Sequence, residues 1–469
     1  MQSLSLEKLT NILNGKILSR SNNHQIPFVV SRFRTAPPTC ITFLNKSFVN
    51  EPSLLSLFKS HDVRCVVVKS PNMLTLNKWN AADIAIVEVQ NLSRAYRSLA
   101  MFYRDQFSIP FIQVIGSSGK TTTKEMIGSV LNEKFPTLTS LKNMNSPTGV
   151  AKNLFRLNKT PRAAVLEAGM KASGIIRTAT RLIKPDIGVI TSIHSAHLTR
   201  LGSIQNIIAA KAEIFEYLSK DGCMIVNWDD PNCQRLPFHR YHGKLLRFGF
   251  SEECDLWASD IQRQGFRTNF KINTKDLQFA CTINIVGRYN VGNALAATAV
   301  GLKMGLSPME IAHGLEQFNP VNGRLKVYHR SDGAVVIDDT YNANPDSTRL
   351  LIDELIIMAR EQPVVLVIGD MERPSRDIEN YARSVHFNIG QQLAQGAFQH
   401  VMAIGLWASE YVRGAIQAGF PQNKISYYET VRAAETSFKY LITPGTTVVL
   451  KASTYTKLKH LDINDYCSC

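Results

Sequence analysis

The sequence lacks most of the features that mark secreted, membrane-spanning or disordered proteins. No apolar run approaches the roughly 20 residues of a membrane-spanning helix, and no low-complexity or like-charge block is typical of a disordered tail. The amino terminus does not resemble a secretion signal, and the eight cysteines are spread through 469 residues. The terminal Cys467-Ser468-Cys469 is too closely spaced for the usual CxxC metal or redox pattern. We therefore expect a soluble, cytoplasmic protein with no membrane span.

Acidic residues are scarce relative to basic ones. The chain has 53 Lys and Arg against 38 Asp and Glu, which gives a formal net charge of +15. This excess favours anionic partners such as nucleotides or acidic metabolites. The basic residues are scattered and do not form patches interleaved with aromatic residues, so we expect no nucleic acid partner.

The length and the apolar pattern predict an α/β protein of three domains. A single core stops growing well below 469 residues, and the content of 44% hydrophobic and 19% charged residues is ordinary for a globular chain. Residues 1–106 contain the apolar runs TCITFLN and VRCVVV between turn-rich and helical stretches. We expect this part to form a small amino-terminal α/β domain.

Residues 107–318 are expected to form the central domain. Helix-length periodic segments separate the apolar runs FIQVIG (111–116), AAVLEAG (163–169), DIGVITSI (186–193) and GCMIVN (222–227). Strands that alternate with helices predict a mostly parallel, doubly wound sheet. Between about residues 244 and 289, the runs KLLRFGF and FACTINIVG predict antiparallel strands added to that sheet, and a helix follows from about Asn290.

Residues 319–469 are expected to form a separate Rossmann-like domain. The linker NPVNGRLK (319–326) leads into a second alternating series of apolar runs. These runs are GAVVIDDTY, PVVLVIGDM (363–371), HVMAIG (400–405), KISYYE (424–429) and TTVVLKAS (446–453).

The segment that follows the first central run predicts a phosphate-binding loop of the P-loop type. The apolar run leads into Gly116-Ser117-Ser118-Gly119-Lys120-Thr121, and helix-forming residues follow. Backbone N–H groups at a helix amino terminus attract phosphate oxygens, while the lysine reaches the β and γ phosphates and the threonine hydroxyl binds Mg²⁺. The general pattern has Gly where this chain has Gln113, so the match is incomplete at its first position. The order of strand, loop and helix still predicts nucleotide binding.

Residues suited to a metal-bound phosphate follow the next strands. Glu167 ends one apolar run, His194 and His197 follow another, and Lys211 and Glu213 lie on a predicted helix. In open α/β sheets the ligand site lies at the carboxyl ends of the strands, where a Glu and a His can share Mg²⁺ with ATP oxygens. Their convergence behind a phosphate loop therefore predicts a metal site.

In order along the chain, these motifs resemble the Mur ligases of peptidoglycan synthesis. The resemblance rests on GSSGKTTTKEM, NMNSPTGVAKNL (143–154), LEAGM, KPDIGVITSIHSAHLTRLGSIQNIIAAKAEIF (184–215), NWDDPN, GRYNVGNALAATAVGLKMG (287–305) and DDTYNANPDS (338–347). These segments cover nearly all of the expected central domain and the start of the last one. The resemblance implies an ATP-dependent carbon–nitrogen ligase that activates a carboxylate as an acyl phosphate for attack by an amino acid or dipeptide amine.

The resemblance also implies roles for single residues. Lys120 and Thr121 would hold the ATP phosphates and Mg²⁺, with Glu167 and His197 as further metal ligands. Lys211 matches a lysine that CO₂ carbamylates in this family, so that it serves a second metal site. Because a free lysine has a pKa of about 10.4, carbamylation requires a site that favours the neutral amine.

Further implied contacts surround the nucleotide. Asn290 and Asn293 would recognise adenine, Arg324 would meet the ATP phosphates across the linker, and Asp339 would lie near the ribose. Residues in the same nucleotide-facing loop are Tyr341, Asn342 and Asn344. Lys120, Lys211, His197 and Arg324 are the expected catalytic residues. Taken singly, these residues have simpler explanations: a surface lysine, two helix caps, a linker ion pair and a turn residue.

The substrate-binding parts leave more than one function open. In the resembling family the first domain binds the UDP part of a carrier and the last domain binds the incoming amine. This chain keeps Ser31-Arg32 without the preceding Asp or an Asp-Gly-His pattern, and Lys451-Ala452-Ser453 replaces Lys-Gly-Ser. The altered segment after Gly369-Asp370-Met371 is a further departure.

Two ligase functions therefore stand beside one alternative of another class. The ligase would either add D-alanyl-D-alanine to a UDP-linked muramoyl tripeptide or join another amine to a different carboxylate. The alternative is a non-ligating ATP-binding switch or scaffold, which would not need Glu167, His197 and Lys211 together. We expect the protein to act as a monomer.

Overall fold

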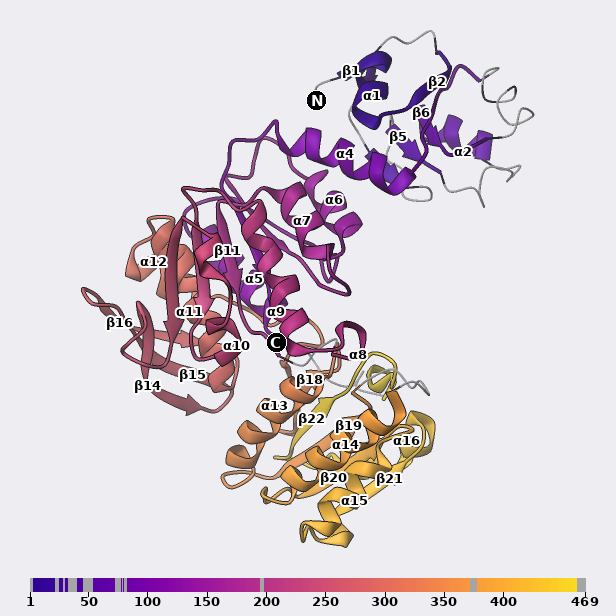
Figure 1. Ribbon diagram of the computed structural model, residues 1–469. Helices are drawn as coiled ribbons and strands as arrows, with labels where there is room; N and C mark the ends of the chain where they lie inside the picture. Colours follow the sequence, from indigo (N-terminus) through magenta and orange to yellow (C-terminus); the bar gives the residue numbers. More distant parts are fainter. Residues whose placement is uncertain are drawn as a thin grey trace.

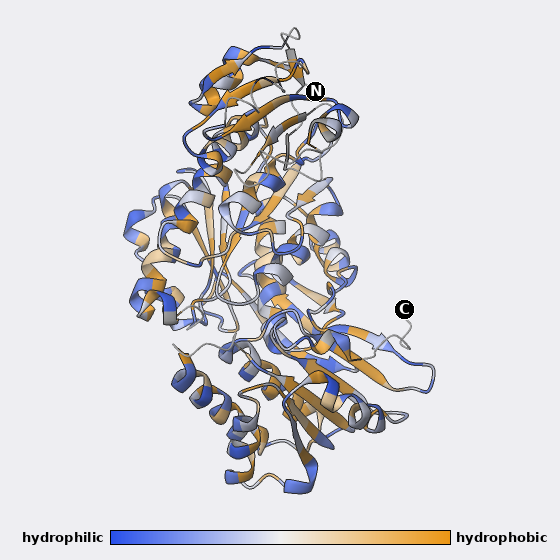
Figure 2. Ribbon diagram, turned by 90° about the vertical axis from the view of Figure 1, so that its right-hand side faces the viewer, coloured by the Kyte–Doolittle hydropathy of each residue, from blue (hydrophilic) through white to orange (hydrophobic). Residues whose placement is uncertain are grey.

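The computed structural model describes residues 3–21, 25–27, 30–32, 40–44, 54–71, 77, 79, 82–194, 198–371 and 378–461. These residues form three α/β bodies that follow one another along the chain, coloured indigo, purple to salmon, and orange to yellow (Figure 1). The apolar residues concentrate on the strands, whereas helices and loops carry most of the hydrophilic ones (Figure 2). Among the described residues, no helix is both long and apolar enough to cross a membrane.

The amino-terminal body contains a five-stranded sheet, in the order β2-β7-β6-β5-β4, and a two-stranded sheet of β1 and β3. Strands β4 to β7 pair in parallel, and β2 runs antiparallel to β7. The α/β character predicted for this part is confirmed, with CITF of the first predicted run in β5 and VRCVVV in β6. The elements are β1 (Ser3–Ser5), α1 (Leu6–Leu13), β2 (Lys16–Ser19), β3 (Gln25–Pro27), β4 (Val30–Arg32), β5 (Cys40–Phe43), α2 (Leu54–Ser60), β6 (Val63–Val68) and β7 (Ala85–Glu88).

Helix α4 (Leu92–Arg104) attaches this body to the central one. It contacts α1 on one side and the central helices α6 and α7 on the other. The Tyr103 hydroxyl donates to the Leu157 carbonyl at 2.6 Å, and the Arg104 Nε donates to the Ile183 carbonyl at 2.6 Å. One apolar cluster runs from α1 through α4 to the inner sides of α6 and α7. The core is therefore continuous across residue 106.

The central body is built on a nine-stranded sheet in the order β16-β15-β14-β13-β12-β11-β8-β10-β9. The strands are β8 (Phe111–Ile115), β9 (Thr137–Thr139), β10 (Ala163–Glu167), β11 (Ile187–Ile190), β12 (Cys223–Asn227), β13 (Lys244–Gly249), β14 (Leu256–Gln264), β15 (Arg267–Asn273) and β16 (Gln278–Ile283). The four runs expected to form its parallel part are β8, β10, β11 and β12.

One expectation for this sheet is wrong. The run KLLRFGF forms β13, which pairs in parallel with β12 and with β14 and is not an antiparallel addition. Only β14, β15 and β16 pair with one another in antiparallel fashion, so FACTINIVG is placed as expected. The chain reaches β13 through α10 and a 3-10 turn, which is enough of a crossover to return in the parallel direction.

Helices cover both faces of the central sheet. Those on one face are α5 (Lys120–Asn132), α11 (Arg288–Lys303) and α12 (Pro308–Glu316). Those on the other are α6 (Pro147–Leu154), α7 (Ile175–Ile183) and α9 (Ile204–Ala212), with α8 (Leu198–Leu201) and α10 (Pro231–Gln234) as short connections. Strand β8 lies between β11 and β10, and the chain leaves it for β9 and β10 on one side and for β11 on the other. The carboxyl end of β8 is thus the point at which ligands bind in sheets of this type.

The carboxyl-terminal body has a six-stranded sheet in the order β17-β18-β22-β19-β20-β21, parallel except for the edge strand β17. This arrangement confirms the predicted Rossmann-like pattern. The strands are β17 (Lys326–His329), β18 (Val335–Asp339), β19 (Val364–Gly369), β20 (His400–Ile404), β21 (Ile425–Tyr428) and β22 (Thr447–Lys451). The helices are α13 (Pro345–Met358), α14 (Glu379–Leu393), α15 (Ser409–Gln417) and α16 (Val431–Leu441).

Candidate active site

The phosphate loop lies between β8 and α5, as the sequence predicts. Gly119 is the residue before α5 and has φ 79°, a left-handed conformation that favours glycine. A Cβ at this position would also lie 2.5 Å from Asn293 Oδ1. The Lys120 ammonium donates to the carbonyls of Gly116 and Ser117 at 2.9 and 3.1 Å. The lysine therefore lies over its own loop, next to the backbone that would meet phosphate oxygens.

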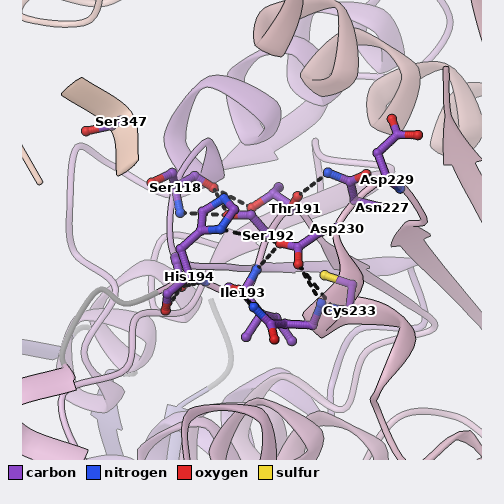
Figure 3. A network of polar contacts seen from close by, with 12 residues as sticks. Ser118, Thr191, Ser192, Ile193, His194, Asn227, Asp229, Asp230, Cys233 and Ser347 are labelled. Atoms are coloured by element: carbon purple, nitrogen blue, oxygen red, sulfur yellow. Dashed lines mark hydrogen bonds and ion pairs between the residues drawn. The ribbon is translucent and has the colours of Figure 1, made fainter. Parts of the chain in front are cut away.

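A second segment holds this loop from the side (Figure 3). Ser117 N and Ser118 N donate to the carbonyl and to the hydroxyl of Ser192, at 2.8 and 3.0 Å. The Thr191 hydroxyl donates to the Ser118 carbonyl at 2.5 Å, and His194 N donates to the Ser117 hydroxyl at 3.0 Å. The stretch after β11 therefore fixes the backbone of the phosphate loop.

Glu167 lies at the end of β10 and faces the start of α5. Its two carboxylate oxygens accept hydrogen bonds from the Thr121 hydroxyl at 2.9 Å and from Asn145 Nδ2 at 2.7 Å. The carboxylate is buried, and within the described part of the chain it forms no ion pair. Asn145 was not among the predicted site residues, although it belongs to the motif NMNSPTG, because nothing in the sequence shows that its loop returns to Glu167.

Lys211 is buried at the end of α9, with 1% of its surface exposed. Its pKa is lowered to about 7, mainly by burial and also by the positive charge of Lys120, while Cys233 and Asp230 act in the opposite direction. A large fraction of the amine is therefore neutral near neutral pH. The surface-lysine explanation is wrong for this residue. Glu213, just after α9, instead accepts the backbone N–H groups of α7.

Of the two predicted histidines, His194 lies within the described residues. His194 lines the site, and its Nδ1 lies 3.7 Å from Asp230 Oδ2. His197, expected as a metal ligand and catalytic residue, lies outside the described residues.

Arg324 enters the site from the linker. Its guanidinium lies over the Tyr341 ring, 4.2 Å from the ring centroid. The Nε atom is buried and has no hydrogen-bond partner, and no described carboxylate forms an ion pair with this arginine. The simple explanation of a linker ion pair is therefore not supported. Burial lowers the pKa of Lys120, Glu167 raises it and Arg324 lowers it, so the two cations are close enough to repel each other.

Asp339 is not free at the end of β18. The Lys451 ammonium donates to its carboxylate at 2.5 Å and to the Asn342 carbonyl at 3.1 Å, and both side chains are largely buried. Lys451, at the end of β22, was not predicted as a site residue, because its partner is 112 positions away in the chain. This ion pair fixes the loop that carries Tyr341 and Asn342.

Asn290 and Asn293 lie inside the first turns of α11 and bond to each other. Asn293 Nδ2 donates to Asn290 Oδ1 at 3.0 Å, while Asn293 Oδ1 accepts from the Thr123 hydroxyl at 3.0 Å. Helix α11 begins at Arg288 after Gly287, so the explanation of both asparagines as helix caps is wrong. Asn344 does cap α13, and its Nδ2 lies 3.4 Å from the Ser118 hydroxyl of the phosphate loop.

These residues surround one cavity of about 920 Å³ between the central and carboxyl-terminal bodies. Ser347, in the first turn of α13, also lines it. Gly116 and Lys211 do not line it. The predicted site residues that line it are Ser117, Ser118, Gly119, Lys120, Thr121, Glu167, His194, Asn290, Asn293, Arg324, Asp339, Tyr341, Asn342 and Asn344.

Two family models match the chain. The Mur ligase middle domain matches residues 114–301, and the Mur ligase, glutamate ligase domain matches residues 323–454. The chain belongs to the Mur ligase family. This Mur ligase is an ATP-dependent enzyme that forms an amide bond.

Individual relatives of this Mur ligase match it over most of their length. A UDP-N-acetylmuramoyl-tripeptide–D-alanyl-D-alanine ligase from Bacillus subtilis (strain 168) is 30% identical over 377 residues, which are 80% of each chain. The enzyme of that name from Escherichia coli (strain K12) is 28% identical over 409 residues, 86% of each chain. A crystal structure of MurF from Acinetobacter baumannii superposes with a TM-score of 0.85 at 27% identity and covers 99% of both chains.

The ADP complex of MurF from Thermotoga maritima shares the fold of this Mur ligase. It has a TM-score of 0.76 at 21% identity and covers 91% of this chain and 94% of the other. Both family matches include residues that line the cavity.

Proposed function

We propose that this Mur ligase adds D-alanyl-D-alanine to the carboxylate of a UDP-linked muramoyl tripeptide. The relatives from Bacillus subtilis and Escherichia coli carry that activity in their names and align with most of this chain. The observation that carries the chemistry is the convergence of Lys120 and Arg324 on one cavity, where neither cation forms an ion pair with a described carboxylate. Two cations that line one cavity and lack a described carboxylate partner are suited to a polyphosphate.

The reaction follows from this arrangement. The substrate carboxylate attacks the γ-phosphorus of ATP, and the bond to the β-phosphate oxygen breaks, which gives an acyl phosphate and ADP. The amine then attacks the acyl carbon, loses a proton and displaces inorganic phosphate. Lys120 and Arg324 stabilise the charge that develops on the transferred phosphoryl group. The protein otherwise contributes by holding both reactants in line.

The residues around Glu167 fit a divalent cation. Its carboxylate is buried and has only two neutral donors, Thr121 and Asn145, so its negative charge is not balanced by a described cation in contact with it. Oxygen ligands of this kind are those that Mg²⁺ prefers. Thr121 and Glu167 would hold the ion, with His197 and Lys211 toward a second position. Bound Mg²⁺ would neutralise charge on the phosphates.

Lys211 is suited to reaction with CO₂. Only a neutral amine attacks CO₂, and burial lowers the pKa of this amine to about 7. Within the described residues it has no hydrogen-bond or ion-pair partner that would hold it as an ammonium. We therefore assign Lys211 as the carbamylated lysine. The carbamate would orient the metal ions and would explain why a lysine is buried here at all.

The adenosine part of ATP would lie between α11 and the loop after β18. Asn290 and Asn293 present amide groups at the wall of the cavity, and Tyr341 presents a ring. Asp339 would reach the ribose only if it shares its carboxylate with Lys451, because that ion pair is already formed.

A second candidate is a ligase of the same chemistry with another pair of substrates. It is favoured by Ala452 in the Lys451-Ala452-Ser453 segment and by the absence of an Asp before Ser31. An assay of ADP release by purified protein with ATP distinguishes the two candidate functions. Release of ADP that requires both the UDP-linked tripeptide and D-alanyl-D-alanine, with the joined product seen by mass spectrometry, supports the first. Release that requires a different carboxylate or amine supports the second, and slow release without either substrate contradicts both.

A further inference from the structure

The turn after β12 forms hydrogen bonds with the segment that follows β11. Asp230 is 5% exposed and lies at the start of the four-residue helix α10. Its Oδ1 accepts the backbone N–H groups of Asn232 and Cys233, at 2.9 and 3.3 Å. Its Oδ2 reaches across to Ile193 N at 2.7 Å (Figure 3). One oxygen thus caps the helix and the other binds the segment after β11.

Two asparagines bind the same segment. Asn227 Nδ2 donates to the Thr191 carbonyl at 2.9 Å, and Asn232 Nδ2 donates to the Ile193 carbonyl at 2.9 Å. The motif Asn227-Trp228-Asp229-Asp230-Pro231-Asn232 therefore holds residues 191–193 at three backbone groups. We call Asn227, Asp230 and Asn232 the backbone clamp.

The clamped segment is the one that holds the phosphate loop. Thr191 and Ser192 bind both backbone groups of Ser118 and the N–H of Ser117. Within the described part of the chain, no hydrogen bond of the three clamp side chains reaches residues 116–119, so their effect on the loop passes through residues 191–194.

We propose that Asn227, Asp230 and Asn232 are positioning residues for ATP, which act on the phosphate loop through Thr191, Ser192 and Ile193. The amides of Ser117 and Ser118 are bonded to Ser192, so they anchor the loop. The amides that follow them at the start of α5 must point together at phosphate oxygens before the nucleotide arrives, because aligning them afterwards would reduce the binding free energy. A carboxylate and two amides, bound to backbone rather than to mobile side chains, keep the neighbouring segment in one place. This proposal rests on the proposed function only in that the loop binds ATP.

The test is Asp230→Asn, which preserves size and removes the charge. Asparagine has only one side-chain oxygen, and its NH₂ group takes the place of the other carboxylate oxygen. Either the N–H of Ile193 or the N–H groups at the start of α10 therefore lose their acceptor. Asp255→Asn is the matched control. Asp255 also accepts a backbone N–H, from Arg247 on β13 at 2.8 Å, but it lies outside the cavity.

Hydrogen exchange is measured on nucleotide-free protein, and the dissociation constant is measured by titration with ADP. Hydrogen exchange of peptides that cover residues 116–119 and 191–194 should be faster in Asp230→Asn and unchanged in Asp255→Asn. The dissociation constant for ADP should rise about tenfold or more in Asp230→Asn, the loss typical of a hydrogen bond to a charged group, at unchanged stoichiometry. Reduced stoichiometry at unchanged affinity would indicate partial unfolding and would contradict a positioning role.

Failure of the proposal and of the proposed function can be told apart. Wild-type protein that does not bind ADP contradicts the function. Wild-type protein that binds ADP, together with an Asp230→Asn protein that has the same affinity and exchange, contradicts the clamp. If Asp230→Asn does not fold, Asn227→Ala is measured in its place. This variant removes one of the three clamp bonds, and unchanged exchange of residues 116–119 would then overturn the proposal.

Discussion

Gln113 offers a sharp test of how the central sheet is packed. It occupies the middle of β8, is 0% exposed, and both its amide nitrogen and its amide oxygen lack hydrogen-bond partners. Phe111 and Ile115 of the same strand belong to the apolar cluster under α6, α7 and α9, and the alternation of a strand places Gln113 on that face. A polar group has therefore been removed from water without compensation.

The substitution Gln113→Met keeps the length of the side chain and removes the amide. An unsatisfied buried polar group costs about 1–3 kcal/mol, and we expect the variant to be more stable by that amount. Because the chain has three domains, a melting curve of the whole protein is not one transition. Native-state hydrogen exchange of the β8, β10 and β11 amides reads the opening of this sheet directly.

Exchange of these amides should slow by about 5- to 150-fold in Gln113→Met, which is the same free energy expressed as an equilibrium constant. Gln417→Met is the matched control. Gln417 is exposed on α15, and its substitution should leave the exchange of the central sheet unchanged. Faster exchange in Gln113→Met would refute the reasoning, because it would mean that the amide is satisfied in solution, for example by a buried water.

Four further predictions concern lysines of the candidate site. Lys120→Ala should abolish ADP release, whereas Lys211→Ala should lose activity that short carboxylic acids partly restore; full activity of Lys211→Ala without additive would remove the carbamate assignment. The pKa of Lys211 falls from 10.5 to about 7 on folding, so between these values the unfolded chain binds the extra proton and the contribution of Lys211 to stability rises with pH. Wild-type protein should therefore gain thermal stability relative to Lys211→Met from about pH 7 to about pH 9, and a constant difference would contradict the shift. Lys451→Met leaves the Asp339 carboxylate buried and unpaired and should destabilise the last domain by about 3–5 kcal/mol, measured by native-state hydrogen exchange of the β18 and β22 amides, with partial recovery in the double variant Lys451→Met, Asp339→Asn. Equal stability of the single and the double variant would argue against this ion pair.

Most of the fold could be predicted from the sequence, because each parallel strand is a short apolar run between helix-length segments. The prediction failed at β13, whose apolar run is interrupted by polar residues although the strand pairs on both sides in parallel. Apolar periodicity specifies a face of the sheet, but the direction of pairing depends on the connection that leads into the strand.

The candidate site was predictable where one short motif contains all the interacting groups, as in the loop from Gly116 to Thr121. Residues whose partners lie far away in the chain were missed. Asn145 meets Glu167 across 22 positions, and Asp230 meets Ile193 across 37. Such pairs are created by the order of strands in the sheet, which brings loops together that the linear sequence keeps apart.

The position of α4 has a practical consequence for anyone who wishes to study the ATP-binding part alone. A fragment that starts at residue 107 would strip the hydrophobic side of α4 from α6 and α7 and would leave Phe155 without the ring of Tyr96 at 5.2 Å. Such a fragment should precipitate or self-associate. One that starts just before Leu92 would keep this covering helix and should stay in solution.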